Sequence, residues 1–176
     1  MIHKPRRKNS LRLKGWNYRA AGYYFLTFCS HNREQLFEKD PITSYLAQTW
    51  ERIPTWKNMA HFQTDAFVIM PNHIHAILWI TTSDVTADTP ASPKVEPGSA
   101  GAAVGTFKST TTRQLRGKHN FSPDLAVWQR GYYDRIIRDE AELNRIREYI
   151  DLNPVRWAEN RDNYDELLSK MNYHPD

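Results

Sequence analysis

Apolar and polar positions recur along the chain in a pattern that indicates four strands. Residues 23–30 form a short run rich in aromatic and β-branched residues, which is typical of a buried strand. Two further strand-like runs, 63–70 and 73–80, are separated only by a Pro-Asn turn, and we expect them to pair as an antiparallel hairpin in the middle of a sheet. The fourth strand is expected within 127–137.

Apolar residues spaced three or four positions apart indicate helices between and after these strands. Asp40 offers an N-cap, with Pro41 at the first helical position, for the first of them. A second helix is expected over 107–116, and a third begins after Asp139. A short further helix is expected at 164–171.

The resulting order of elements predicts a single α+β domain over 1–176 with a ferredoxin-like antiparallel sheet (βαββαβ) and an additional C-terminal helix. In that arrangement both crossover helices cover one face of the sheet, so the opposite face is left for the C-terminal helix. We expect a basic N-terminal arm over 1–22, a flexible internal loop over 82–103, where small residues, Pro and Gly predominate, and a C-terminal tail over 157–176.

The net charge of +4 is unevenly distributed along the chain. Residues 1–14 contain no acidic residue and six basic ones, namely Lys4, Arg6, Arg7, Lys8, Arg12 and Lys14. Because the whole chain has 24 basic and 20 acidic residues, the remainder is slightly acidic. Such an arm suits an extended contact with nucleic-acid phosphates, although a merely solvated terminus has the same composition.

Cysteine content and hydropathy bear on the compartment. Cys29 is the only cysteine, which excludes an intrachain disulfide and a cysteine-based zinc site and favours a reducing compartment. Residues 1–14 carry charges where a secretory signal would need an apolar core, and no run approaches the ~20 apolar residues of a membrane span. We therefore expect a cytoplasmic protein that does not insert into membranes.

The first candidate for chemistry is the pair His73 and His75. Side chains two positions apart on a strand point to the same face, so the two imidazoles should project together. Ile74 and Ala76 alternate with them and should pack on the crossover helices, which leaves the histidines on the other face of the sheet. The pair suggests a metal site, but His-x-His also occurs in ordinary strands and does not identify one by itself.

The second candidate is Tyr149, which is followed four positions later by Asn153 on the same helical face. One interpretation is structural: a partly buried tyrosine and an asparagine that ends the helix ahead of Pro154. The other is functional. If this helix docks on the open face of the sheet, Tyr149 can serve as a nucleophile and Asn153 as a third metal ligand.

Several segments of the chain, in order from Arg6 to Trp157, resemble the REP-associated tyrosine transposases, which belong to the single-tyrosine HUH transposases. The segments are RLKGW at 12–16, YFLTFC at 24–29, NR at 32–33, FVIMPNHIH at 67–75, FKS at 107–109, VWQR at 127–130, YYD at 132–134 and REYIDLNPVR at 147–156. No family motif covers 82–103 or the residues beyond Trp157.

The resemblance implies a set of roles and partners. It implies that His73, His75 and Asn153 hold Mg²⁺ or Mn²⁺, and that Tyr149 attacks a DNA phosphodiester to form a 5′-phosphotyrosine. The substrate would be single-stranded or hairpin DNA, handled by a nucleoid-associated monomer or homodimer. Glu148 and Asp151 face away from Tyr149 at helical spacing, so the base that deprotonates the phenol is not identified.

DNA contacts are expected from basic side chains, with stacking on an aromatic ring. The basic candidates are Arg6, Arg7, Lys8, Arg12, Lys14, Arg33, Lys108, Arg113 and Arg130. Trp128 and Tyr132 are candidate stacking platforms.

Two alternatives stay open. One is a nucleic-acid-binding protein on the same fold that has lost cleavage, against which the complete Tyr/His/Asn set argues. The other is a two-histidine metallohydrolase acting on a small molecule, which would need a further ligand near the pair. His61 and His119 are the candidates for that ligand, and neither repeats a ligand spacing.

Overall fold

A computed structural model describes residues 15–38, 40–83, 95–119 and 121–159 of the 176-residue chain. Its elements, in chain order, are β1 (Gly22–Cys29), the short helix η1 (His31–Arg33), α1 (Ile42–Glu51), the short helix η2 (Ile53–Thr55), β2 (Phe62–Met70), β3 (His73–Ile80), α2 (Ala100–Lys118), β4 (Tyr133–Ile137) and α3 (Glu140–Glu159). The predicted order of strands and longer helices is therefore confirmed. Within this part of the chain, no helix is long and apolar enough to span a membrane.

The four strands form one antiparallel sheet in the order β2-β3-β1-β4. This is the order that the ferredoxin-like pattern requires, so the predicted fold class is confirmed. The expected hairpin is present as β2 and β3. Of the two hairpin strands, however, only β3 is central: it lies between β2 and β1, and β2 is an edge strand.

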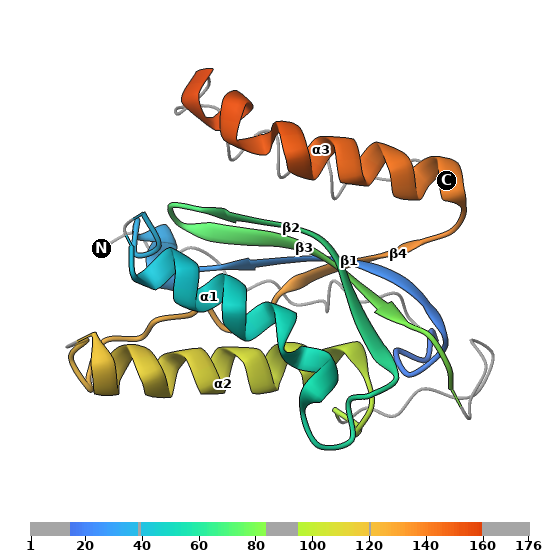
Figure 1. Cartoon of the computed structure of the whole chain (residues 1–176), viewed down its shortest axis with the longest axis horizontal. Helices are drawn as coiled ribbons and strands as arrows, with labels where there is room; N and C mark the ends of the chain where they lie inside the picture. The colour runs from blue at the N-terminus through green and yellow to red at the C-terminus, as the bar shows by residue number, and fades with distance from the viewer. Residues whose placement is uncertain (1–14, 39, 84–94, 120, 160–176) are drawn as a thin grey trace.

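The helices form two layers on opposite faces of the sheet (Figure 1). Side chains that alternate along β1 and β3, such as Leu26 and Ile74, pack with α1 and α2 in the larger core. Phe25 and Ile77 point the other way and pack with Ile146 and other apolar residues of α3. The predicted division of the two faces is therefore confirmed, and α3 covers the face that carries the histidines.

Helix α2 begins earlier than the sequence analysis predicts. Its N-cap is Ser99, whose hydroxyl accepts a hydrogen bond from the backbone N–H of Ala102 at 3.2 Å. Residues 100–103 are therefore helical and do not belong to the predicted loop. Small residues in a polar-looking stretch indicate a loop by composition, but here Ala100 and Ala103 are fully buried, and their small size lets the helix lie close to its neighbours.

Helix α3 continues through Pro154 to Glu159, so Asn153 does not end it as the structural interpretation above would require. A proline inside a helix removes one backbone hydrogen bond. The last turn compensates with side-chain contacts: the Trp157 ring lies 5.7 Å from that of His73. The expected helix at 164–171 lies outside the described residues.

The expected arm over 1–22 is shorter than predicted. Residues 15–21 belong to the domain, since Tyr18 and Ala20 are buried and the Tyr18 carbonyl accepts a hydrogen bond from the backbone N–H of Ala100 at 3.0 Å. Residues 1–14, which hold the basic cluster, lie outside the described part of the chain.

Candidate active site

His73 and His75 lie at the start of β3, directly after the hairpin turn, on the face covered by α3. The period-2 alternation of the strand places both rings on that face, with centroids 4.7 Å apart and planes at 72°. Both side chains are completely buried, at 0% exposure. The predicted convergence of the two imidazoles is therefore present in the fold.

Hydrogen bonds orient both rings. His73 Nδ1 lies 2.7 Å from Asn72 Oδ1, which can only accept, so Nδ1 carries the proton and Nε2 is the accepting nitrogen of the ring. His75 Nδ1 lies 2.8 Å from Thr27 Oγ1, the residue paired with it on β1. The His75 tautomer in which Nδ1 donates to this hydroxyl has an accepting Nε2, which is the form that metal binding requires. Such partners are typical of histidines that bind metals through Nε2.

Burial keeps both imidazoles neutral. It lowers the pKa of His75 to about 3, and it lowers the pKa of His73 well below the ordinary value, with electrostatic contributions from the neighbouring His75 and Arg33 adding to the effect. Neutral imidazole is the form that binds a metal ion.

Tyr149 lies opposite this pair on α3. Its hydroxyl oxygen is 3.2 Å from Nε2 of His75, and the two rings are 5.2 Å apart. Phe25 meets the Tyr149 ring edge-on at 6.2 Å, and the Arg156 guanidinium lies 5.8 Å from its centroid. The phenol oxygen thus points at Nε2 of His75, the nitrogen through which this histidine could bind a metal ion.

Asn153 follows one turn after Tyr149 and is 3% exposed. Its side-chain oxygen is buried and has no hydrogen-bond partner among the described residues. Leaving such an acceptor unsatisfied costs about 1–3 kcal/mol, so the position calls for a donor or a cation. No third His, Cys, Asp or Glu joins the two histidines in the described part of the chain, which leaves the amide oxygen as the third candidate ligand.

An ion pair connects α3 to the edge of the sheet. Arg147 Nε donates to Asp65 Oδ1 at 2.9 Å, and a second guanidinium nitrogen contacts Oδ2. Asp65 lies where the β2–β3 register shifts between Thr64 and Phe67, and a bulge of this kind redirects a side chain. The pair therefore sets the position of the helix that carries Tyr149.

Replacing Asp65 with asparagine should destabilise the fold at neutral pH by up to about 1 kcal/mol, because the pair is partly exposed. The hydrogen bond from Arg147 lowers the pKa of Asp65 in the folded state. Its stabilising effect is therefore complete above the unfolded-state pKa of about 4 and disappears as the pH falls through the lower folded-state value. Denaturant unfolding of both proteins across this range measures the difference. A difference that grows on acidification would contradict this account.

The basic residues expected to contact DNA fall into four groups. Arg33 lies close enough to His73 for its charge to lower the pKa of that histidine. Arg113 and Arg130 are exposed, whereas Lys108 donates hydrogen bonds to the carbonyls of Gln129, at 3.1 Å, and Gly131. Burial lowers the pKa of Lys108 to about 8. Lys108 therefore joins α2 to the segment before β4, and the five residues of the arm lie outside the described range.

The expected stacking platforms and alternative ligands are used elsewhere. Trp128 packs on Phe37 at 4.8 Å and its indole N–H donates to Thr111 Oγ1 at 3.1 Å. Tyr132 packs against the same core. His61 contacts the Gly98 carbonyl at 3.1 Å, and His119 lies beside the Tyr45 ring; neither forms a ligand group with the pair in the described structure.

Sequence reasoning missed four residues that shape the site, namely Thr27, Asp65, Asn72 and Arg156. Thr27 gave a usable signal, because it is the single threonine or serine in a strand that is otherwise mostly aromatic, and its alternation puts it on the histidine face. The other three act through contacts made by the turn, the bulge and the last helical turn, which no local pattern indicates.

Comparison with known proteins identifies the family. No family model matches the chain. An uncharacterised protein of Haemophilus influenzae is 35% identical over 170 residues, covering 88% of this chain and 92% of that protein. A second H. influenzae protein, provisionally named a REP-associated tyrosine transposase, is 27% identical over 157 residues, covering 80% of this chain and 76% of its own length.

A solved structure of a REP-associated tyrosine transposase bound to a REP hairpin has the same fold. The TM-score is 0.55 at 20% identity, with 88% of this chain and 74% of that one covered. The solved structure shows that the fold is the same. The 35% identical protein shows that it and this chain belong to one family, and the named relative and the motif segments identify this family as the REP-associated tyrosine transposases.

Proposed function

We propose that this protein is a metal-dependent enzyme that nicks and rejoins single-stranded DNA through a 5′-phosphotyrosine at Tyr149. The observation that carries the proposal is the 3.2 Å contact between the Tyr149 hydroxyl and Nε2 of His75, in a fold shared with a hairpin-bound transposase. The substrate would be hairpin-associated DNA, processed in transposition or at REP elements.

The metal would be held by His73 and His75 through Nε2 and by the side-chain oxygen of Asn153. This donor set fits a cation, since Asn72 and Thr27 orient the two rings and the amide oxygen is buried without a partner among the described residues. We propose Mg²⁺ or Mn²⁺, which would draw electron density from a phosphate oxygen and orient the phosphodiester.

Tyr149 would then supply the nucleophile. Its oxygen forms a bond to phosphorus while the bond to the 3′ oxygen breaks, and the leaving oxygen takes up a proton to become a 3′-hydroxyl. The phosphodiester energy is kept in the phosphotyrosine, so a DNA 3′-hydroxyl can reverse the reaction and complete strand transfer. Arg156, beside the ring, favours the phenolate electrostatically. None of the three nearby groups is a suitable base for the phenol proton. Glu148 and Asp151 are exposed, and His75, with its pKa near 3, is a weak base.

A cleavage-inactive DNA-binding protein is the alternative on this fold, and a nicking assay separates the two. Circular single-stranded DNA, which offers many sequence contexts, should be linearised with the protein covalently attached. The corresponding closed duplex should remain intact, because one short tyrosine must reach a phosphate whose backbone can bend away from duplex geometry. Binding without cutting, with metal present, would favour the inactive binder.

The polarity of the cut gives a further expected result. On oligonucleotides containing the mapped cut site, the protein should retain the label of the downstream fragment, which carries the 5′ phosphate, and release the upstream fragment with a free 3′-hydroxyl. Labelling each end in turn and separating the products under denaturing conditions measures both. Retention of the upstream label, or duplex cut as readily as single strand, would overturn the mechanism even if Tyr149 proved essential.

A further inference from the structure

Two successive residues just after β1, Asn32 and Arg33, have left-handed backbone conformations. Their φ angles are +51° and +57°. Asparagine tolerates this conformation, but arginine adopts it rarely. Strained residues of this kind persist only where the surrounding structure holds them, and they are common at functional sites. The conformation of Arg33 therefore needs both a structural cause and a reason for its presence.

Hydrogen bonds to the hairpin turn between β2 and β3 hold this segment in place. The Asn72 side chain donates from Nδ2 to the Arg33 carbonyl at 3.2 Å, and its Oδ1 accepts from Nδ1 of His73 at 2.7 Å. The Ser30 hydroxyl donates to the Glu34 carbonyl at 2.6 Å, and the Ser30 backbone N–H donates to the Asn72 carbonyl at 2.9 Å. One side chain, Asn72, thus fixes a candidate metal ligand and the backbone of Arg33 together.

The charge of Arg33 lies at the end of the sheet where β3 begins. Burial lowers the pKa of His73, and the nearby His75 and Arg33 add to the effect. Burial raises the pKa of Cys29, and the charge of Arg33 opposes that rise. His73 and Cys29 are partners across β1 and β3, so Arg33 lies close to both. The last turn of α3 reaches the same end, since the Trp157 ring is 5.7 Å from that of His73.

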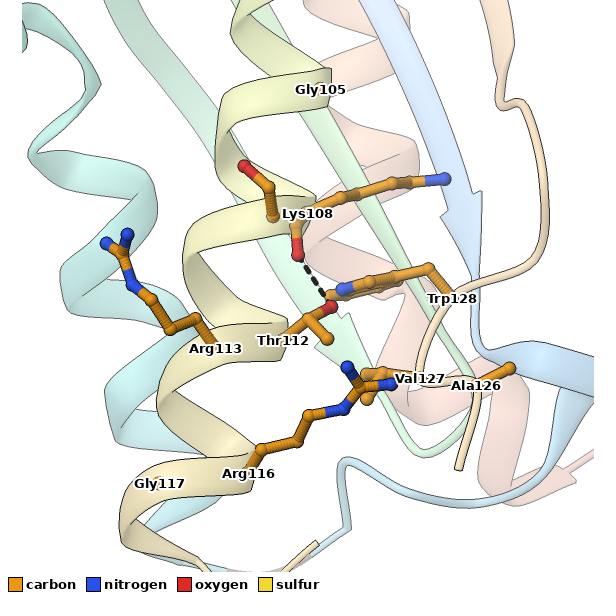
Figure 2. A pocket seen from close by; sticks show the side chains of 10 residues that line it. Gly105, Lys108, Thr112, Arg113, Arg116, Gly117, Ala126, Val127 and Trp128 are labelled. Carbon is orange, nitrogen blue, oxygen red and sulfur yellow. Dashed lines mark hydrogen bonds between the residues drawn. The ribbon is translucent and has the colours of Figure 1, made fainter. Parts of the chain in front are cut away.

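The cations of α2 lie on the other side of the sheet. Figure 2 shows Lys108, Arg113 and Arg116 projecting from this helix, whose buried residues pack on the face away from the histidines. On the histidine face, the Arg156 guanidinium lies 5.8 Å from the centroid of the nucleophile's ring, where it acts on the phenol. Among the described residues, this leaves Arg33 as the candidate to meet the phosphate.

The charges of the proposed site call for an anion beside Arg33. The proposed ligands His73, His75 and Asn153 are neutral, and no Asp or Glu completes a metal-binding group with the histidines in the described ranges. A divalent cation and a guanidinium at one site repel each other unless an anion lies between them. The scissile phosphodiester supplies that anion, and the paired N–H donors of arginine match its oxygens.

We infer that Arg33 is a catalytic residue of the nicking reaction, which binds a non-bridging oxygen of the phosphate that Tyr149 attacks. The inference rests on the proposed nicking function and adds to it a protein group that stabilises the transition state. While the bond from the Tyr149 oxygen to phosphorus forms and the bond to the 3′ oxygen breaks, the guanidinium neutralises charge on the phosphate and exchanges no proton. Asn72 is a positioning residue, because it holds the backbone from which Arg33 extends.

Replacing Arg33 with glutamine should lower the cleavage rate at saturating DNA about a hundredfold or more, which is the effect of removing one donor to a developing negative charge. Affinity for the same oligonucleotide should fall only severalfold, because a single phosphate contact is lost. Single-turnover rates and binding titrations on single-stranded DNA with the mapped cut site measure the two quantities. Arg33→Lys should keep part of the rate, since it retains the charge without the paired donors.

Replacing Arg33 with glycine separates catalysis from folding. Glycine adopts a left-handed φ without strain, so this variant should be at least as stable to denaturant as the wild type while it loses as much activity as Arg33→Gln. Calorimetric titration of Mn²⁺ should show no loss of metal affinity in either variant, because Arg33 is not a ligand.

Asn32→Gly is the matched control, because it relieves the same backbone conformation one residue earlier and leaves the guanidinium in place. Arg138→Gln removes an exposed charge at the opposite end of the sheet. Both controls should cut at the wild-type rate.

A wild-type rate at saturating DNA in Arg33→Gln would overturn the inference. A loss confined to DNA affinity would overturn it too, as would a loss of rate that follows an equal loss of Mn²⁺ affinity. Failure of the proposed function gives a different result, because the wild-type protein itself would then form no covalent adduct with single-stranded DNA.

Discussion

Replacing Tyr149 with phenylalanine should abolish the covalent protein–DNA adduct while leaving DNA binding almost unchanged. The substitution removes only the oxygen that attacks phosphorus, and the ring keeps its packing against Phe25 and His75. Loss of the hydrogen bond to His75 should lower stability by only about 0.5–1.5 kcal/mol. Denaturing gels of the reaction with single-stranded DNA measure the adduct, and binding titrations measure affinity.

Tyr23→Phe is the matched control for this experiment. Tyr23 lies on the same face of the sheet and stacks on Trp79 at 5.0 Å, at the opposite end of β1 from the histidines. This variant should form the adduct at the wild-type rate. A denaturant-resistant adduct that persists in the Tyr149→Phe protein would exclude Tyr149 as the nucleophile.

Replacing His73 or His75 with alanine should lower the cleavage rate by about a thousandfold or more. Loss of a metal ion removes several kcal/mol of transition-state stabilisation, and each 1.36 kcal/mol corresponds to a factor of ten in rate. A chelator should have the same effect on the wild-type protein, and Mn²⁺ should reverse it. Asn153→Ala should have a smaller effect, because water can replace one amide ligand.

Both histidines are buried, so replacing either one also leaves a cavity that lowers stability. Metal binding should therefore be measured directly, by calorimetric titration of Mn²⁺. His61→Ala, which removes a histidine that contacts the Gly98 carbonyl away from the pair, should bind Mn²⁺ like the wild type. Full cleavage by the wild-type protein in excess chelator would show that the histidine pair is structural.

Local patterns in the sequence were sufficient for the order of the strands along the chain and for the face on which the histidines lie. The period of two along β3 places His73 and His75 together and sends Ile74 and Ala76 to the other core, and this depends on no distant residue. Helix boundaries were less well determined. The start of α2 and the continuation of α3 through Pro154 depend on burial of small side chains and on contacts of the last turn, which outweigh local preference.

The chain by itself therefore determined which residue types could perform the chemistry, and only the tertiary structure decided how they meet. Tyr149 and His75 are 74 positions apart, and their contact requires that α3 lie across the sheet at one particular rotation. Asp65 and Arg147, 82 positions apart, hold that rotation through a bulge that the hydrophobic pattern does not reveal. Periodicity reports which face a side chain takes, whereas the docking of a helix on that face depends on packing and ion pairs between distant segments.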